Sequence, residues 1–165
     1  MRAETLHQTI LLAIVAGLAL SIYAWYETIN PAAQAGCSIY PWLSCGAVAR
    51  SGHTTTLGIQ DYWFGIVGFG LMLGIDIPLY RSWNRRLLVA LLLVAGAGLG
   101  AAVYLATIET FIIGAFCPVC LSTYVADAIV FFAALALYRR GRATDREEAV
   151  EDASPSAAEP DSATA

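Results

Sequence analysis

The sequence predicts an all-α, polytopic membrane protein in which four transmembrane helices form a bundle. Of the 165 residues, 58% are hydrophobic and only 13% are charged, whereas a soluble domain of this size needs a polar exterior. The apolar residues also form four long segments, each close to the ~20 residues that cross a hydrocarbon core of about 30 Å. A short helix is also expected in the loop after the first segment.

The four segments and their connections follow in order along the chain. The first covers about residues 10–29 and the second about residues 62–80, and a loop of about thirty residues, 30–60, joins them. Apolar residues after Pro41 predict a short helix that rests on the membrane surface. The third segment, 87–108, contains Gly96, Gly98 and Gly100, whose small size permits close helix contact. Residues 109–116 are expected to be a short turn before the fourth segment, 117–138.

Charge is concentrated at the C-terminal end of the chain. Residues 1–138 contain five arginines and six acidic residues, and residues 139–165 contain four arginines and seven acidic residues. The segment 139–165 is therefore expected to be a disordered, acidic cytoplasmic tail. The net charge of −4 belongs mostly to this tail, so it says nothing about nucleic-acid binding. We expect the lipid bilayer to surround the body and expect no nucleic-acid partner.

The placement of arginine predicts how the helices cross the cell membrane. The clusters RSWNRR (81–86) and YRRGR (138–142) flank helices, and the positive-inside rule places both in the cytoplasm. Both termini, including residues 1–8, are then cytoplasmic, and the loop 30–60 and the turn 109–116 are extracytoplasmic. Four cysteines fall on that outer side: Cys37, Cys45, Cys117 and Cys120.

The C-P-V-C motif at 117–120 opens the fourth helix. Its first sulfur lies near the unsatisfied N–H groups of the first turn, where the helix dipole favours a thiolate, and Pro118 suits the first helical position. A structural disulfide, half of a zinc site and an exchangeable redox pair all fit the motif. No histidine stands at ligand spacing beside Cys37 and Cys45, so we predict no metal site. Two dithiols, one near lipid and one near solvent, favour a thiol–disulfide relay.

Together these features resemble the vitamin K epoxide reductase family, specifically its prokaryotic branch, over about residues 9–138. The ordered combination is more specific than any single piece. The matching features are Cys37 and Cys45 with seven residues between them, Ser51 six residues later, Phe64-Gly65 at the start of the second helix, and FCPVC followed by Ser122, Thr123 and Tyr124.

The resemblance implies a four-helix bundle around a membrane quinone, of the menaquinone or ubiquinone type, capped by the loop 30–60. Electrons would pass from a separate thioredoxin-like extracytoplasmic protein to Cys37 and Cys45, then to Cys117 and Cys120, and then to the quinone. Cys120 would meet the quinone ring and Cys45 would exchange with Cys117. The implied role is disulfide formation in exported proteins, similar to that of the DsbB quinone-dependent disulfide oxidases.

Four residues are candidates for binding the quinone: Asp61, Phe64, Tyr124 and Ser51. Tyr124 lies one turn beyond Cys120 on the same helix face, where its hydroxyl can bond a quinone carbonyl. Asp61 departs from the family, which often has an asparagine there. A protonated Asp61 donates a proton, whereas an ionised one repels a developing quinol anion, and capping of the second helix is its alternative role.

Some residues and functions stay open at this point. Asp127 lies on nearly the same helix face as Cys120 and receives no role, and Trp42 and His53 are interpreted as packing residues of the loop. Within the enzyme class, reduction of vitamin K epoxide with a dithiol donor is the alternative activity. Outside it, the alternative is a structural membrane protein with two stabilising disulfides.

Overall fold

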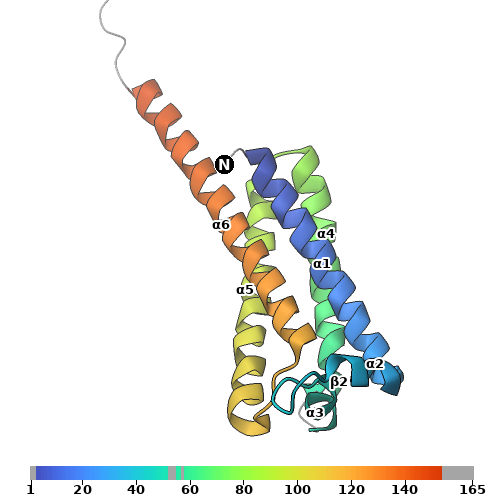
Figure 1. Cartoon of the computed structure of the whole chain (residues 1–165). Helices are drawn as coiled ribbons and strands as arrows, with labels where there is room; N and C mark the ends of the chain where they lie inside the picture. The colour runs from blue at the N-terminus through green and yellow to red at the C-terminus, as the bar shows by residue number, and fades with distance from the viewer. Residues whose placement is uncertain (1–2, 52–54, 57, 154–165) are drawn as a thin grey trace, which may run out of the picture.

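Four long helices lie side by side in the computed structural model, which describes residues 3–51, 55–56 and 58–153 (Figure 1). They are α1 (Ala3–Ile29), α4 (Asp61–Arg81), α5 (Arg85–Ile108) and α6 (Pro118–Ala153). Within that part of the chain, four spans are long and apolar enough to cross a membrane: Glu4–Ile29, Asp61–Arg81, Arg85–Ile113 and Pro118–Gly141. The predicted all-α, four-helix membrane bundle is confirmed.

Apolar side chains from all four long helices fill the centre of the bundle. Helices α1 and α5 each pack against both α4 and α6. Large apolar residues also cover the outside, where the exposed fraction of Leu12 is 71% and that of Leu93 is 69%. Because lipid tails are as apolar as these side chains, the shapes of the helices decide which of them pack together. The largest fully buried side chains are Ile10, Ile14, Leu79, Leu88, Leu91, Val130 and Leu137.

Two of the three glycines in α5 allow it to approach α6 closely. A Cβ atom at Gly96 would lie 3.4 Å from a ring carbon of Phe131, and one at Gly98 would lie 2.8 Å from Oδ2 of Asp127. A Cβ atom at Gly100 would meet nothing within 4 Å. The predicted contact role is therefore confirmed for Gly96 and Gly98 and is wrong for Gly100.

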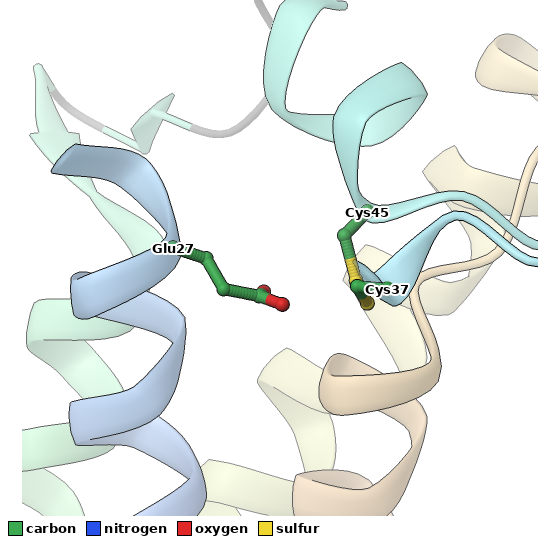
Figure 2. A group of neighbouring side chains, drawn as sticks. All are labelled: Glu27, Cys37 and Cys45. Carbon is green, nitrogen blue, oxygen red and sulfur yellow. A yellow bond between two sulfur atoms is a disulfide. The ribbon is translucent and has the colours of Figure 1, made fainter. Parts of the chain in front are cut away.

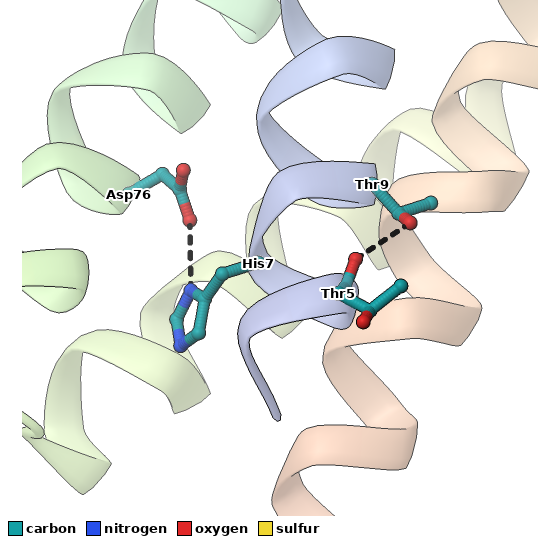
Figure 3. Close-up of polar contacts among 4 residues, drawn as sticks. All are labelled: Thr5, His7, Thr9 and Asp76. Carbon is teal, nitrogen blue, oxygen red and sulfur yellow. Dashed lines mark hydrogen bonds and ion pairs between the residues drawn. The ribbon is translucent and has the colours of Figure 1, made fainter. Parts of the chain in front are cut away.

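A polar pair joins α1 to α4 at the end of the bundle that holds the N-terminus. Nδ1 of His7 lies 3.9 Å from Oδ1 of Asp76, and Asp76 is buried (Figure 3). The ring of Tyr80 meets the His7 ring edge-on at a centroid distance of 5.9 Å. His7 lies in α1, which begins at Ala3 and so includes part of the segment 1–8 that we expected to precede the first span.

The connection between α1 and α4 contains more regular structure than the predicted single short helix. Helix α3 (Cys45–Arg50) is the helix expected after Pro41, and Oγ of Ser44 caps it by accepting the Ala47 N–H at 3.2 Å. Helix α2 (Pro31–Cys37) was not expected, although Asn30 caps it and proline stands at its first position, which is a standard start signal. Strands β1 (Thr55–Thr56) and β2 (Ile59–Gln60) pair antiparallel. Helices α2 and α3 lie at the end opposite the N-terminus (Figure 1).

Two expectations about the second half of the chain are wrong. Residues 109–116 are not simply a turn, because a π-helical segment, η1 (Glu109–Ile113), continues α5 until Gly114 ends it with φ 68°. Residues 139–153 are not disordered, because α6 continues through Ala153. Alanine, glutamate and arginine, which are frequent in 139–153, are strong helix formers, and they extend a helix that the bundle has already nucleated. Residues 154–165 of the expected tail lie outside the described part of the chain.

Replacement of Gly17 tests the packing of α1 on α4. A Cβ atom at Gly17 would overlap the ring of Phe69, so we expect Gly17→Ala to lower the free energy of unfolding by about 1–3 kcal/mol, the usual cost of overpacking. Gly70→Ala is the control, because a Cβ atom there meets nothing within 4 Å. Thermal unfolding in detergent, followed by circular dichroism, measures both. Equal midpoints for the two variants would contradict the packing described.

Candidate functional site: two cysteine pairs beside a cavity

The four cysteines gather at the end of the bundle that holds α2 and α3. Cys37 and Cys45 form a disulfide with a Cα–Cα distance of 5.6 Å, which is ordinary for such a bond. Cys117 and Cys120 are free thiols. The Sγ atoms of Cys45 and Cys117 are 3.5 Å apart, so the disulfide and the nearest free thiol are already in contact. This distance is compatible with the expected thiol–disulfide exchange between Cys45 and Cys117.

A backbone bridge holds these two sulfurs together. The N–H of Phe116 donates to the carbonyl of Trp42 at 2.8 Å, and the N–H of Ser44 donates to the carbonyl of Phe116 at 2.9 Å. Cys45 directly follows Ser44, and Cys117 directly follows Phe116. The loop is therefore attached to the segment that leads into α6. Trp42 itself is exposed and stacks on Tyr40 at a centroid distance of 5.6 Å, whereas His53 lies outside the described residues.

The second pair lies at the N-terminus of α6, as the sequence predicts. Pro118 is the first residue of the helix, and the backbone N–H of Cys120 donates to Sγ of Cys117 at 3.3 Å. Hydrogen bonds from the Cys120 thiol and from this N–H lower the pKa of Cys117 and outweigh the opposing effect of burial. Cys117 is therefore the better nucleophile of the two at neutral pH, because the thiolate is the attacking form.

A cavity of about 380 Å³ lies beneath the cysteines, within the size range of small-molecule sites. All four long helices contribute to its wall, and so does α3. Cys45, Cys117 and Cys120 line it together with three of the candidate quinone-binding residues: Asp61, Phe64 and Tyr124. Ser51, the fourth candidate, is not among the lining residues in the described part of the chain. Its hydroxyl donates to the carbonyl of Val48 at 2.7 Å, at the end of α3.

Glu109 is a site residue that the sequence analysis missed. Its side chain is buried and lines the cavity. Oε2 accepts the backbone N–H of Cys117 at 3.4 Å, and Oε1 accepts the hydroxyl of Tyr124 at 3.3 Å. The sequence could have indicated Glu109, because it is the single charged residue in the apolar stretch 102–116. An ionisable residue inside a membrane span is a functional candidate by default.

Glu27 is a second missed carboxylate, and it points from α1 toward the Cys37–Cys45 disulfide (Figure 2). It is buried, and one carboxylate oxygen and the two sulfurs all lie within 4.8 Å of one another. Three such donors can form part of a zinc site. However, zinc binds thiolate sulfur, and these sulfurs are bonded to each other here. Metal binding at this position would therefore require the disulfide to be reduced first.

Asp127 lines the inner part of the cavity, where α6 meets Gly98 of α5. It is buried, and neither carboxylate oxygen has a hydrogen-bond partner among the described residues. A polar group in such a position costs free energy unless water or a ligand satisfies it. The structure thus adds three buried carboxylates, Glu27, Glu109 and Asp127, to the cysteine-centred site.

Alkylation of Cys117 tests its lowered pKa. While the loop disulfide remains intact, the alkylation rate should reach half its maximum at a lower pH than for an ordinary thiol, because more thiolate is present at each pH. Cys120→Ala removes the thiol that lowers the pKa most and should move this midpoint upward. Cys120→Ser keeps an O–H donor and should move it less. Peptide mass spectrometry gives the rates, and one midpoint for all three proteins would contradict the assignment.

Removal of two cysteines tests the contact between the pairs. In Cys37→Ser/Cys120→Ser only Cys45 and Cys117 remain, and mild oxidation should join them, since their Sγ atoms are 3.5 Å apart. The control is Cys45→Ser/Cys120→Ser, in which Cys37 and Cys117 are the cysteines that remain. Cross-linking of this pair should be slower by about tenfold or more, because small displacements of reacting atoms are costly. Non-reducing peptide mapping measures both rates. Equal rates would show that Cys45 is not the specific neighbour of Cys117.

Comparison with protein families agrees with this arrangement. The model described as the vitamin K epoxide reductase family matches residues 8–135. That range contains all four cysteines, the lining residues of the cavity and most of each membrane span. The match covers more than half of the chain, and it confirms the resemblance carried by the cysteine spacing. The chain therefore belongs to the vitamin K epoxide reductase family and is a multi-pass membrane oxidoreductase.

Proposed function

We propose that this protein is a quinone-dependent thiol–disulfide oxidoreductase of the prokaryotic branch of the family. In this role it accepts electrons from a separate thioredoxin-like protein and passes them to a membrane quinone of the menaquinone or ubiquinone type. The outcome is disulfide formation in exported proteins. The observation that carries the proposal is the 3.5 Å separation between Sγ of Cys45, in one pair, and Sγ of Cys117, in the other.

The relay consists of balanced thiol–disulfide exchanges. The partner's dithiol reduces the Cys37–Cys45 disulfide through a mixed disulfide at Cys37 and leaves as a disulfide. The Cys45 thiolate then attacks Cys117 of the Cys117–Cys120 disulfide, and Cys120 leaves as a thiolate. Attack of Cys37 on Cys45 releases Cys117. The products are an oxidised loop pair and a reduced helix pair, the redox state found in this structure.

The last step returns the helix pair to its oxidised form. Cys117 and Cys120 together give up two electrons and two protons, and the quinone takes them up to become a quinol. The cavity fits such a substrate because it is mainly apolar, with Phe64, Asp61 and Tyr124 in its wall. Cys120, which also lines the cavity, is the sulfur that we assign to the quinone ring.

The arginine clusters support an extracytoplasmic position for the cysteines. The two clusters lie at the same end of the bundle, since Nη2 of Arg85 donates to the Tyr138 hydroxyl at 3.3 Å and the Trp83 ring lies close to Gly141. The cysteines lie at the opposite end. The positive-inside rule therefore assigns both termini to the cytoplasm and the cysteine end to the compartment outside it, where disulfides persist.

Single serine variants separate the two halves of the relay. Protein reduced beforehand is mixed with a short-chain quinone, and the loss of quinone absorbance is followed. Cys120→Ser should abolish quinone reduction. Cys37→Ser should lose turnover with a reduced thioredoxin-like protein but retain one round of quinone reduction by Cys117 and Cys120. If both variants match the wild type in both assays, the relay is wrong.

Two further measurements test the alternative functions. Turnover of vitamin K epoxide with a dithiol, at a rate comparable to quinone reduction, would favour epoxide as the substrate. Rapid trapping of thiols in cells tests the structural alternative. The relay predicts that Cys117 and Cys120 are partly reduced or in mixed disulfides, whereas a fully oxidised and unreactive pair would favour two structural disulfides.

A further inference from the structure

Glu109 bridges the reactive thiol pair and the tyrosine of the cavity. One carboxylate oxygen accepts the Cys117 N–H at 3.4 Å, and the other accepts the Tyr124 hydroxyl at 3.3 Å. The side chain is only 4% exposed, and all three residues line the cavity with Cys120. The charge of Glu109 also acts on the sulfurs of Cys117 and Cys120.

Thiol oxidation releases protons as well as electrons. When two thiols form a disulfide, two protons leave the sulfurs, and a quinone needs two protons to become a quinol. Electron transfer without proton transfer would leave uncompensated charge in a low-dielectric cavity, which is costly. Each proton therefore needs a short route from sulfur to a quinone oxygen.

The Tyr124 hydroxyl has a single proton to donate, and in this structure it donates that proton to Glu109. An ionised Glu109 thus keeps the Tyr124 proton away from a ligand in the cavity. Once Glu109 is protonated, it can donate to the Tyr124 oxygen, and the Tyr124 proton becomes available to a quinone oxygen. The protonation state of Glu109 therefore decides which way Tyr124 donates.

We propose that Glu109 carries protons from the thiols of Cys117 and Cys120 to Tyr124, which delivers them to the quinone oxygens. This inference rests on the proposed function and adds the proton route to it. In each transfer Glu109 accepts a thiol proton and gives it to the Tyr124 oxygen, while Tyr124 gives its own proton to the quinone. Two transfers accompany the two electrons, and Glu109 ends as a carboxylate each time.

Other titratable groups also face this region. Asp61 from α4 and Glu27 from α1 line the same cavity, and their charges act on Glu109 and on the sulfurs, respectively. Cys117, Cys120 and Tyr124 face Glu109 from the α6 side. A pH dependence measured on the wild type alone would combine all of these groups. A variant that neutralises only Glu109 isolates the contribution of the one group that is hydrogen-bonded to both Cys117 and Tyr124.

Glu109→Gln is the decisive variant, because it keeps an acceptor oxygen for the Cys117 N–H but cannot take up a proton. In single turnovers of reduced protein with a short-chain quinone, we expect the saturating rate to fall by about 100-fold, within the range for a positioned acid or base. The half-saturating quinone concentration should stay unchanged, and the contribution of Glu109 to the pH dependence of the wild-type rate should disappear. Asp76→Asn, which neutralises a buried carboxylate at the other end of the bundle, should leave the rate unchanged.

The exchange between Cys45 and Cys117 provides a readout that involves no quinone. A wild-type exchange rate in Glu109→Gln would show that the cysteine geometry is intact and that the defect lies in proton transfer. A wild-type quinone rate with a wild-type pH profile in this variant would overturn the proton route and leave the proposed function standing. Absence of quinone reduction by the wild-type protein would overturn the proposed function itself.

A second pair of variants carries the test if Glu109→Gln does not assemble. Glu109→Asp keeps the carboxylate and should react slowly with the pH dependence of the wild type. Tyr124→Phe keeps Glu109 but removes the hydroxyl that delivers the proton, so the contribution of Glu109 to this dependence should be lost. A wild-type rate and pH dependence in Tyr124→Phe would overturn the route.

Discussion

The site depends on the backbone bridge that joins the loop to the segment before α6. Two hydrogen bonds, from Phe116 to Trp42 and from Ser44 to Phe116, fix the residues that immediately precede Cys45 and Cys117. Each such bond contributes only about 0.5–1.5 kcal/mol, yet a displacement of about 1 Å between reacting atoms can slow a reaction 100-fold. The bridge therefore contributes little to stability, and its main effect is to fix the distance between the two sulfurs.

Burial in the membrane then determines how the chemistry handles charge. Membrane-buried carboxylates are costly, and two of them lie beside the sulfurs, Glu27 near the loop disulfide and Glu109 near Cys117. Cysteines gain and lose protons as disulfides open and close, so these are the places where a proton acceptor is needed. The buried carboxylate of Asp76 and its partner His7 lie at the end of the bundle that holds the N-terminus, away from the cysteines, and fit a role in joining α1 to α4.

The sequence was sufficient for the spans and for the cysteines, because both depend on local signals. Apolar length predicted the four helices, and the C-P-V-C motif predicted a thiol at a helix N-terminus. The bridge between Trp42 and Phe116 and the position of Glu109 beside Tyr124 depend on tertiary contacts, which a single sequence does not contain. Ser51 also depends on the fold, since its place in a motif suggested the cavity and its hydroxyl donates to the carbonyl of Val48 at the end of α3.

The two loop cysteines are held differently, and this difference matches the unequal roles proposed for them. Cys45 begins α3 and is tied through Ser44 to the bridge, whereas Cys37 ends the seven-residue helix α2, which is joined to Ser44 by the hydroxyl of Ser38 at 2.9 Å. A partner that attacks Cys37 frees the Cys45 thiolate without disturbing the two bridge hydrogen bonds. The released sulfur is then already beside Cys117. Attack at Cys45 would instead place the partner on the sulfur that lies 3.5 Å from Cys117. The proposed attack at Cys37 keeps that sulfur clear of the partner.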